Sequence, residues 1–364
     1  MVERDRPVRL LVLYGGRSAE HDVSCVSALH VVAAIDRDRY DLRMVGITTT
    51  GRWVDTTAAA LAAASSAGAP ALPSPDAVLR ERPSSESELA TIASAGPEVV
   101  VLPLLHGPMG EDGTVQGFLE LAGVPYCGAG VAGSAVAMDK GLAKALLASA
   151  GLPQARYLYR SEWQFDRNLA SVVERQLGWP VFVKPANMGS SIGITRVKDR
   201  GGFDAALRQA TRYDSAVVIE EAVHGARELE MGVLGWPELR TSVPGEIKPS
   251  REFYDFEDKY LEGAAGLEVP ASLPDGLQEE MARLARAACE ALRIDSMARV
   301  DFFYEPSGRG FLINEVNTIP GFTPISMYPR LWAASGIAYP ALVDTLVEQA
   351  LQRAERRRRY ETGR

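Results

Sequence analysis

The stretch "MARVDFFYEPSGRGFLINEVN", residues 297–317, contains two apolar runs on either side of a segment that holds Pro306, Gly308 and Gly310. Proline and glycine at this spacing favour a tight turn, and apolar runs rich in β-branched and aromatic residues favour strands. The stretch is therefore predicted to form a β-hairpin, and its polar residues fall at positions where strand geometry decides what they can do.

Side chains alternate along a strand, so every second residue of each arm is expected on one face of the hairpin. The first arm then presents Arg299, Asp301 and Phe303, and the second presents Ile313, Glu315 and Asn317. A turn centred on Gly308 places Asp301 opposite Glu315, where two carboxylates repel each other. A divalent cation between them would turn repulsion into attraction, since Mg²⁺ prefers oxygen ligands. A polar face open to water explains the same residues equally well, and neighbouring phosphate-binding signals favour the metal site.

Composition narrows the class of protein. The chain has 364 residues, of which 24% are charged and 46% hydrophobic, and a net charge of −8. This length predicts two or three domains, and the acidic balance argues against a nucleic-acid binder. Three scattered cysteines and the absence of a signal-like or membrane-spanning run predict a soluble cytoplasmic protein without disulfides or zinc. The basic end "RAERRRRYETGR" is expected to be a solvated helix end rather than a phosphate-binding arm.

The first part of the chain alternates strands and helices. "RLLVLYGG", "YDLRMVGIT" and "PEVVVLPLLHG" are predicted strands, with helices from about residue 24 to 34 and in "GTVQGFLELAG". This order predicts a parallel α/β domain up to about residue 130. The Ala/Ser/Pro-rich residues 56–96 are expected to be a partly helical, poorly constrained surface insertion.

The remainder is predicted to form two further units. "AVAMDKGLAKALLASAGLP" is expected to be a single helix that stops at Gly151. Strands "WPVFVKPAN", "GITRV" and "SAVVIEEAV" and a helix at 203–210 follow, and then "RELEMGVLG", a helix over 275–292 and the hairpin.

A second signal is "KPANMGSSIGI", residues 184–194, in which Lys184 leaves a strand before a Gly/Ser loop. Backbone N–H groups of such a loop can cradle phosphate oxygens, and the lysine can neutralise them. The lysine precedes the glycines, which disfavours a Walker-type P-loop, and a plain hairpin turn is the commoner explanation of a Gly/Ser loop taken alone.

Three weaker signals lie elsewhere. The strand in "VVIEEAVHGARE" ends in Glu220 and Glu221, with Glu228 close behind, and can grip an adenine amino group and ribose hydroxyls. Glu20 begins a helix after a glycine turn, where it either compensates the helix dipole or holds a substrate ammonium. His106 stands at a strand end, where α/β domains place ligands, although a lone histidine is more often structural.

Together the segments "GGRSAEHDVS", "LHGPMGEDGTVQG", "MDKGLAKALLASAGLP", "VKPANMGSSIGI", "FYDFEDKYL", "ARVDFF" and "NEVNTIPGFTPISMYP" resemble the D-alanine–D-alanine ligases, in order and over nearly the whole chain. These are ATP-grasp enzymes of bacterial cell-wall (peptidoglycan) synthesis. The resemblance implies ligation of two D-alanines through a D-alanyl phosphate, with release of ADP and phosphate. It further implies two Mg²⁺ or Mn²⁺ ions, a monovalent cation, a homodimer, and neither nucleic acid nor membrane as a partner.

The resemblance also implies the fold and its divisions. An N-terminal α/β domain over 1–133 is expected to precede a two-subdomain ATP-grasp fold, with a central subdomain over 134–226 that carries the glycine-rich loop. A C-terminal subdomain over 227–364 is expected to carry the lid "FYDFEDKYL" and the metal site.

Residue roles carry over by motif. The metal ligands would be Asp301, Glu315 and Asn317, and the ATP-binding residues would be Lys140, Lys184, Ser190, Ser191, Glu220, Glu221, Val223 and Glu228. Catalysis would fall to Glu20, Ser190, Tyr260, Arg299 and Gly321. Substrate contacts would come from His106, Lys259, Ser326 and Met327.

Alternatives stay open. The pair Lys259 and Tyr260 favours a dipeptide product over the D-alanyl-D-lactate made by related ligases, and another ATP-grasp amino-acid ligase is the further rival. A nucleotide-sensing module without catalysis would be expected to lose residues such as Arg299 and Asp301, which are present. A dehydrogenase would require G-x-G-x-x-G where this chain has "GGRSAE".

Overall fold

The first sheet is built from residues near the N-terminus of the computed structural model, which describes residues 7–66, 68–82, 88–248, 266–323 and 325–360. Its order is β3-β2-β1-β4, and β1 pairs in parallel with both β2 and β4. The strands are β1 (Val8–Gly15), β2 (Tyr40–Ile47), β3 (Trp53–Asp55) and β4 (Val99–Pro103). The continuous apolar runs of β1 and β4 are buried, as expected for parallel strands covered on both faces.

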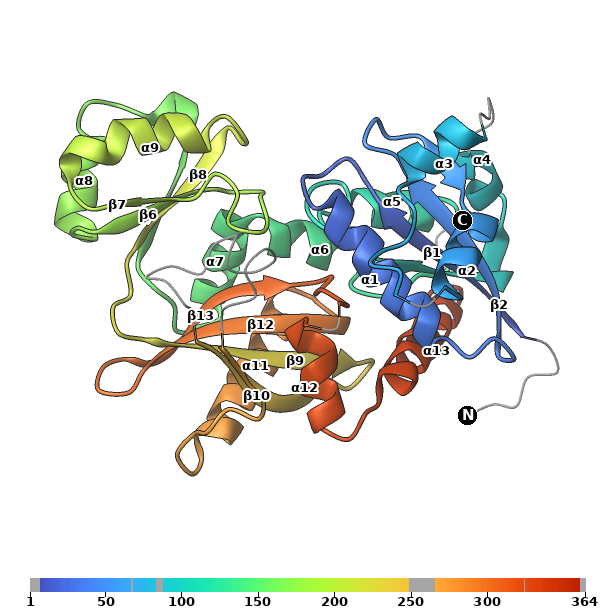
Figure 1. Cartoon of the computed structure of the whole chain (residues 1–364). Coiled ribbons are helices and arrows are strands. Elements are labelled where there is room, and N and C mark those ends of the chain that lie inside the picture. The colour runs from blue at the N-terminus through green and yellow to red at the C-terminus, as the bar shows by residue number, and fades with distance from the viewer. Residues whose placement is uncertain (1–6, 67, 83–87, 249–265, 324, 361–364) are drawn as a thin grey trace.

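Helices α1 (His21–Ala34) and α5 (Thr114–Leu121) accompany this sheet, which confirms the predicted parallel α/β unit. The turn after β1 requires glycine at position 15, because its φ is +85° and a Cβ there would lie 2.4 Å from the Ile47 carbonyl oxygen. This turn connects β1 to α1 (Figure 1). Glu20 is the residue directly before α1, so it lies near the carboxyl end of β1.

The Ala/Ser/Pro-rich segment is helical, as predicted, but its described part is more constrained than expected. It forms α2 (Thr57–Ala64), α3 (Pro75–Glu81) and α4 (Glu88–Ala93). Apolar side chains such as Ala60, Leu72, Val78 and Ile92 are buried, so the insertion packs on the domain instead of lying loosely on its surface.

The predicted single helix over "AVAMDKGLAKALLASAGLP" is wrong, since the structure has α6 (Val131–Met138) and α7 (Lys140–Ser149). The break falls at Asp139, whose backbone is extended and whose side chain accepts hydrogen bonds from Gly141 N and Leu142 N, both at 2.9 Å. Aspartate favours this N-cap role over a helix interior. The break brings Lys140 to the first turn of a new helix.

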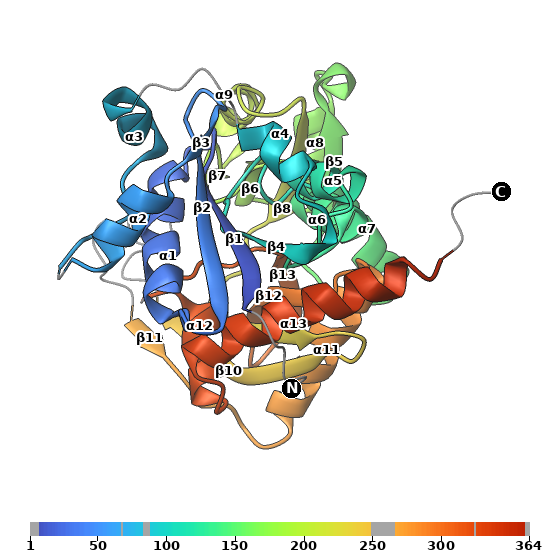
Figure 2. The ribbon, with the colours of Figure 1, turned by 90° about the vertical axis from the view of Figure 1, so that its right-hand side faces the viewer.

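Two antiparallel sheets form the rest of the chain (Figures 1 and 2). One has the order β5-β8-β6-β7 and the other β11-β10-β9-β12-β13. The strands of the first are β5 (Tyr157–Ser161), β6 (Val181–Pro185), β7 (Thr195–Val197) and β8 (Ala216–Glu221), and α8 (Leu169–Gln176) and α9 (Phe203–Ala210) accompany them. The strands of the second are β9 (Arg227–Gly235), β10 (Arg240–Lys248), β11 (Gly266–Glu268), β12 (Ser296–Glu305) and β13 (Gly310–Asn317), with α11 (Leu277–Ala291) and α12 (Met327–Ala334).

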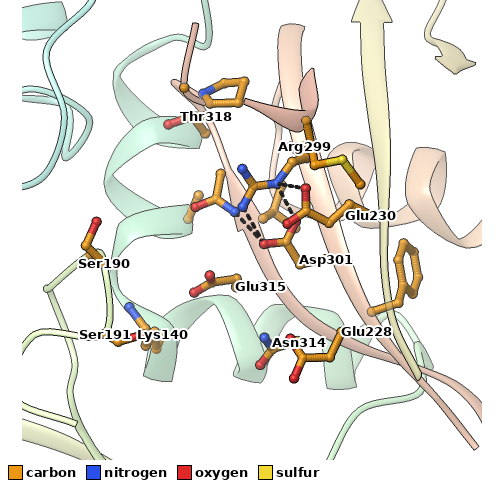
Figure 3. Close-up of a pocket in the computed structure, with 18 of the residues that line it drawn as sticks. Lys140, Ser190, Ser191, Glu228, Glu230, Arg299, Asp301, Asn314, Glu315 and Thr318 are labelled. Carbon is orange, nitrogen blue, oxygen red and sulfur yellow. Dashed lines mark hydrogen bonds and ion pairs between the residues drawn. The ribbon is translucent and has the colours of Figure 1, made fainter. Parts of the chain in front are cut away.

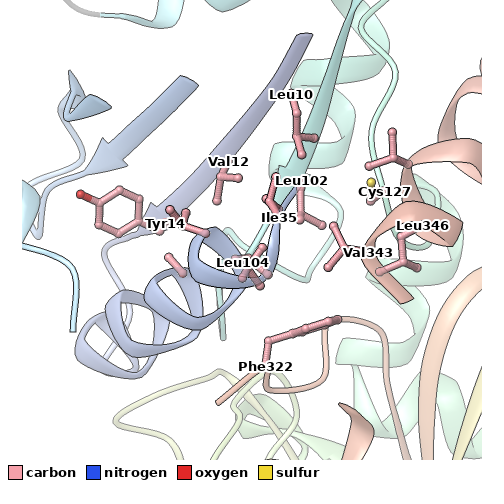
Figure 4. Packing of buried hydrophobic residues seen from close by; sticks show 14 of the residues in the cluster. Leu10, Val12, Tyr14, Ile35, Leu102, Leu104, Cys127, Phe322, Val343 and Leu346 are labelled. Atoms are coloured by element: carbon pink, nitrogen blue, oxygen red, sulfur yellow. The ribbon is translucent and has the colours of Figure 1, made fainter. Parts of the chain in front are cut away.

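The last helix, α13 (Tyr339–Arg357), returns to the first sheet (Figure 2). Its Val343 and Leu346 belong to one buried cluster with Leu102 and Leu104 of the β4 region and with Phe322 (Figure 4). The chain's final described helix therefore completes the hydrophobic core that its first strands begin.

The basic C-terminal end is solvated as expected at Arg356, Arg358 and Arg359, but its first arginine is buried. Arg353 is 5% exposed and donates to the backbone oxygens of Gly128 and Tyr126, at 2.5 and 2.8 Å, while it pairs with Asp295 at 2.7 Å. These contacts fix the crossover between the first domain and α6. None of the described helices is long and apolar enough to span a membrane.

Candidate active site

A cavity of about 490 Å³ opens where the first domain meets the two antiparallel sheets. Every predicted site residue that the structure describes lines it: Glu20, His106, Lys140, Lys184, Ser190, Ser191, Glu220, Glu221, Val223, Glu228, Arg299, Asp301, Glu315, Asn317, Gly321, Ser326 and Met327. Lys259 and Tyr260, with the rest of the expected lid, lie outside the described residues.

Three carboxylates lie in a row across the second antiparallel sheet. Asp301 on β12 pairs in register with Glu315 on β13, as predicted, and with Glu230 on β9. Arg299, two residues before Asp301 on the same strand, contacts two of the three carboxylates (Figure 3). A buried guanidinium thus offsets the repulsion within the row.

The Arg299 contacts are close. Its Nε and Nη2 donate to the two Asp301 oxygens, each at 2.7 Å, and its Nε lies 2.9 Å from Glu230 Oε2. Burial alone would lower the pKa of Arg299, but Asp301 and Glu230 outweigh burial and raise it well above its usual value. Arg299 therefore stays charged and is held in one orientation.

The second arm of the hairpin departs from simple alternation. The register shifts between Asp301 and Phe302, so Phe302 pairs with Ile313 and both are buried in the core on the other face. The expectation that Ile313 shares a face with Glu315 is therefore wrong. The cause is a β-bulge, which leaves Asn314 as the extra residue and brings it to the cavity lining beside Glu315.

The donor set suits a hard divalent cation. Asp301, Glu315 and Asn317 offer two carboxylates and an amide oxygen to one cavity, the chemistry that Mg²⁺ prefers. In this structure Asn317 Nδ2 donates to Asp301 Oδ2 at 3.0 Å, which orients the two side chains toward each other. Among the residues that the structure describes, no group of three or more His, Cys, Asp or Glu side chains is arranged to hold a metal ion.

The glycine-rich loop touches the first domain. Ser190 Oγ donates a short hydrogen bond to Glu20 Oε1, and Lys140 Nζ donates to the Met188 carbonyl oxygen at 2.5 Å. Ser190 and Ser191 have φ of 49° and 60°, the left-handed region that residues other than glycine rarely adopt. Such a conformation persists where surrounding contacts fix it, and here they hold the loop over the cavity.

His106, which is buried, and Glu111, which is half-buried, lie near Glu20. Burial lowers the pKa of His106, against the opposing charge of Glu20, so its imidazole is neutral near pH 7. Burial and then the charge of Glu20 raise the pKa of Glu111, although its Oε1 accepts a 2.8 Å hydrogen bond from Gly107 N. The first domain thus presents Glu20 to the cavity beside His106 and Glu111, whose shifted pKa values favour their neutral forms.

The strand end predicted to bind adenine holds two acidic residues with different surroundings. Glu221 accepts from Arg156 N at 2.8 Å and from Arg156 Nε at 2.7 Å, and it also pairs with Arg309 of the β12–β13 turn. Its carboxylate is therefore committed to two arginines, and its backbone N–H donates to the Arg156 carbonyl oxygen at 3.0 Å. Glu220 is buried and accepts hydrogen bonds from Lys144 and Lys184.

The segment after β13 closes another side of the cavity. Ser326 Oγ lies 2.8 Å from Thr323 Oγ1 and accepts from Thr323 N at 3.1 Å, and Ser326 precedes the first turn of α12. A Cβ at Gly321 would lie 2.6 Å from Ser326 Oγ, so only glycine leaves this hydroxyl in place.

Several lining residues were not predicted. Glu230 follows Glu228 by two on β9, and strand alternation alone places both on one face. Glu111 lies in the quoted segment "LHGPMGEDGT", but nothing in the sequence indicates that it lines the cavity. Asn314 depends on the bulge, which carries no glycine signal.

Solved structures of the same architecture exist. The D-alanine-D-alanine ligase from Coxiella burnetii superposes with a TM-score of 0.82 at 33% identity, over 97% of this chain and 96% of that one. The VanG D-Ala:D-Ser ligase from Enterococcus faecalis superposes with a TM-score of 0.79 at 31% identity, over 95% of this chain and 100% of that one.

Sequence comparisons agree. A family model of the D-ala D-ala ligase N-terminus matches residues 9–129, and one of the D-ala D-ala ligase C-terminus matches residues 146–348. The D-alanine--D-alanine ligase of Kineococcus radiotolerans is 47% identical over an alignment of 365 positions, which covers 95% of this chain and 97% of that protein. The D-alanine--D-alanine ligase of Streptomyces coelicolor is 47% identical over 369 residues, 95% and 93% of the two chains.

The α/β domain, the two antiparallel sheets and the polar cavity between them define an ATP-grasp enzyme. The family models cover most of the chain, and the relatives match it over nearly its full length. The chain belongs to the D-alanine–D-alanine ligase family.

Proposed function

We propose that this protein joins two D-alanines to D-alanyl-D-alanine with hydrolysis of ATP to ADP and phosphate, through a D-alanyl phosphate, in peptidoglycan precursor synthesis. The observation that carries the proposal is the convergence of residues from the first domain and from both antiparallel sheets on one cavity. That cavity holds lysines and a Gly/Ser loop suited to phosphate, an acidic strand end suited to adenine, and Glu20 suited to an ammonium.

The first step is phosphoryl transfer. The carboxylate oxygen of the first D-alanine attacks the γ-phosphorus of ATP, and the bond from that phosphorus to ADP breaks. Attack between two anions requires neutralisation. We assign this to Lys140 and Lys184, with Ser190 and Ser191 around the γ-phosphate, and Glu20 takes the substrate ammonium near the neutral His106. We further assign the adenine to Glu220, Glu221 and Val223, and the ribose hydroxyls to Glu228.

The second step is aminolysis. The free amine of the second D-alanine attacks the acyl carbon, its proton leaves, and the carbon–oxygen bond to phosphate breaks. The negative charge that develops on the carbonyl oxygen is stabilised by preorganised donors. We assign this role to Arg299, which is charged and fixed by Asp301 and Glu230, and to the backbone N–H of Gly321.

Asp301, Glu315 and Asn317 would hold two Mg²⁺ or Mn²⁺ ions, whose charge would neutralise the nucleotide phosphates when bound. The resemblance also implies a monovalent cation, a cytoplasmic homodimer and the three divisions at 1–133, 134–226 and 227–364, and we carry these forward as part of the proposal.

A Gly321→Ala variant is expected to raise the KM of the second D-alanine about tenfold or more while the KM of ATP changes little. The added methyl would displace Ser326 Oγ, which we assign with Met327 N to the second carboxylate. Initial rates at varied D-alanine and varied ATP measure both constants. Gly117→Ala in α5, at a position where nothing lies within 4 Å of the new Cβ and the backbone is helical, controls for glycine replacement as such. Equal rises in both constants would contradict the assignment.

The direct test of the proposed function is phosphate release with ATP, Mg²⁺ and D-alanine, with the product weighed by mass spectrometry. D-alanyl-D-alanine is the expected product. ATP binding without ligation would contradict the proposal.

The alternative is a different second substrate, with D-lactate as the main rival. The structural likeness to a D-Ala:D-Ser ligase adds D-serine, since both proteins share one architecture. D-alanine, D-lactate and D-serine offered together in competition would separate these outcomes, and we expect the dipeptide of D-alanine to dominate.

A further inference from the structure

Glu220 is a buried carboxylate held between two lysines. Lys144 Nζ donates to its Oε1 at 2.7 Å, and Lys184 Nζ donates to its Oε2 at 2.6 Å. Glu220 is 1% exposed and Lys144 is 3% exposed, so the three groups interact with little screening by water. One lysine suffices to balance one carboxylate, and the second lysine therefore calls for an explanation.

The two lysines occupy different sides of the carboxylate. On β8, Glu220 pairs with Tyr157 of β5 on one side and with Phe182 of β6 on the other. Lys144 Nζ lies 5.5 Å from the centre of the Tyr157 ring, and Lys184 Nζ lies 5.9 Å from that of Phe182. Phe182 and Lys184 line the cavity, whereas the lining formed by the described residues includes neither Lys144 nor Tyr157.

This arrangement gives the two lysines different roles. Lys184 faces the cavity, where a nucleotide phosphate competes with Glu220 for its ammonium. If Lys184 turned to the phosphates and Glu220 had no second partner, a buried charge would be left uncompensated, which is strongly unfavourable. With Lys144 behind it, Glu220 keeps a counter-charge on Oε1 and exposes Oε2 to the cavity. Burial raises the pKa of Glu220, but Lys144 and then Lys184 outweigh this and lower it to about 2.

We propose that Lys144 is a positioning residue for base selection: it keeps Glu220 ionised and oriented when Lys184 engages the phosphates, so that Glu220 accepts a hydrogen bond from an exocyclic amino group of the base. The inference rests on the proposed function in that it takes the cavity to be the ATP site. It assigns a role to a residue that does not touch the nucleotide.

Without Lys144, Glu220 has two ways to avoid an unpaired charge. It keeps Lys184, which is then lost to the phosphates, or it takes up a proton. A protonated carboxyl group can donate to a 6-oxo group as well as accept from a 6-amino group. In both cases nucleotide binding weakens and the preference for adenine over hypoxanthine narrows, because Oε2 is either occupied by Lys184 or part of a protonated carboxyl group.

The test is equilibrium binding of ADP and of IDP to the full chain by calorimetry in the presence of Mg²⁺, with no D-alanine present. IDP carries a 6-oxo group in place of the 6-amino group. A hydrogen bond to a charged partner predicts that the wild type prefers ADP by about tenfold to a hundredfold. Lys144→Met is expected to bind ADP at least about tenfold more weakly and to lose most of that preference. Lys144→Arg, which keeps the charge, should restore much of it.

The matched control is Lys198→Met, which removes an exposed lysine just after β7 of the same sheet and should leave both affinities unchanged. If Lys144→Met weakens ADP and IDP equally, Lys144 is only structural and the proposal is overturned. If Lys144→Met does not fold, as judged by circular dichroism, Lys144→Gln is measured against the same ADP-to-IDP ratio. A wild type that binds neither nucleotide would overturn the ATP site itself, whereas an unchanged ratio in the variants overturns the role of Lys144 alone.

Discussion

A Glu315→Gln variant is expected to lose about a hundredfold to a thousandfold or more in kcat and to melt within a few degrees of the wild type. The glutamine side chain would keep the size and the strand position of the glutamate but lose the negative charge that we assign to metal binding. The position lines the cavity and lies opposite Asp301, so the change touches the reaction more than the core. It also removes one member of the carboxylate row, which limits any loss of stability.

The measurement is the initial rate of phosphate release at saturating D-alanine and ATP across a series of Mg²⁺ concentrations, beside a thermal melt. Glu238→Gln, an exposed glutamate in the turn between β9 and β10 of the same sheet, serves as the matched control and should keep full activity. Turnover close to that of the wild type in Glu315→Gln would refute the metal assignment.

An Arg299→Met variant is expected to lose both activity and stability. The guanidinium pairs with Asp301 and Glu230, and its removal leaves two partly buried carboxylates next to each other and beside Glu315. Breaking a buried ion pair by removing one partner costs about 3–5 kcal/mol. In addition, the loss of a positive charge near the developing oxyanion is expected to lower kcat by about two to three orders of magnitude.

A double variant separates the two effects. Arg299→Met with Asp301→Asn removes one of the carboxylates left unpaired, so it should recover part of the lost stability while it stays inactive. Lys248→Met is the control, because Lys248 pairs with Glu268 at 2.6 Å in the same sheet and both side chains are far more exposed. The control should melt close to the wild type, since exposed ion pairs contribute little to stability. If the single variant melts like the wild type, the buried network does not stabilise this sheet as we infer.

The parts of the fold that sequence patterns predicted are those where a local signal and the tertiary structure agree. The hairpin around Gly308 and the facing of Asp301 and Glu315 follow from turn residues and alternation, and both are confirmed. The bulge at Asn314 could not be predicted, because it arises from packing Ile313 into the core rather than from a turn residue. The break at Asp139 was readable as an N-cap signal, but the alanine-rich surroundings masked it.

The candidate site divides in the same way. The sequence predicted Lys184 and Glu315, because their residue types and surrounding motifs indicate phosphate and metal binding. Both line the cavity. Lys144 was not predicted, because a lysine on an alanine-rich helix gives no sign that it is buried until β8 is placed against α7. Long-range pairs of this kind depend on the assembled sheets, and a single sequence does not encode them locally.

The packing of α13 against the first sheet has a consequence for how the protein is made. Translation delivers β1 and β4 long before Val343 and Leu346, yet side chains from all three elements share one core. The strands that are synthesised first can therefore complete their packing only after the last described helix has been synthesised. The first domain therefore leaves the ribosome with an apolar face that stays uncovered until α13 has been made and has packed, and exposed apolar surface of this kind favours aggregation of the nascent chain.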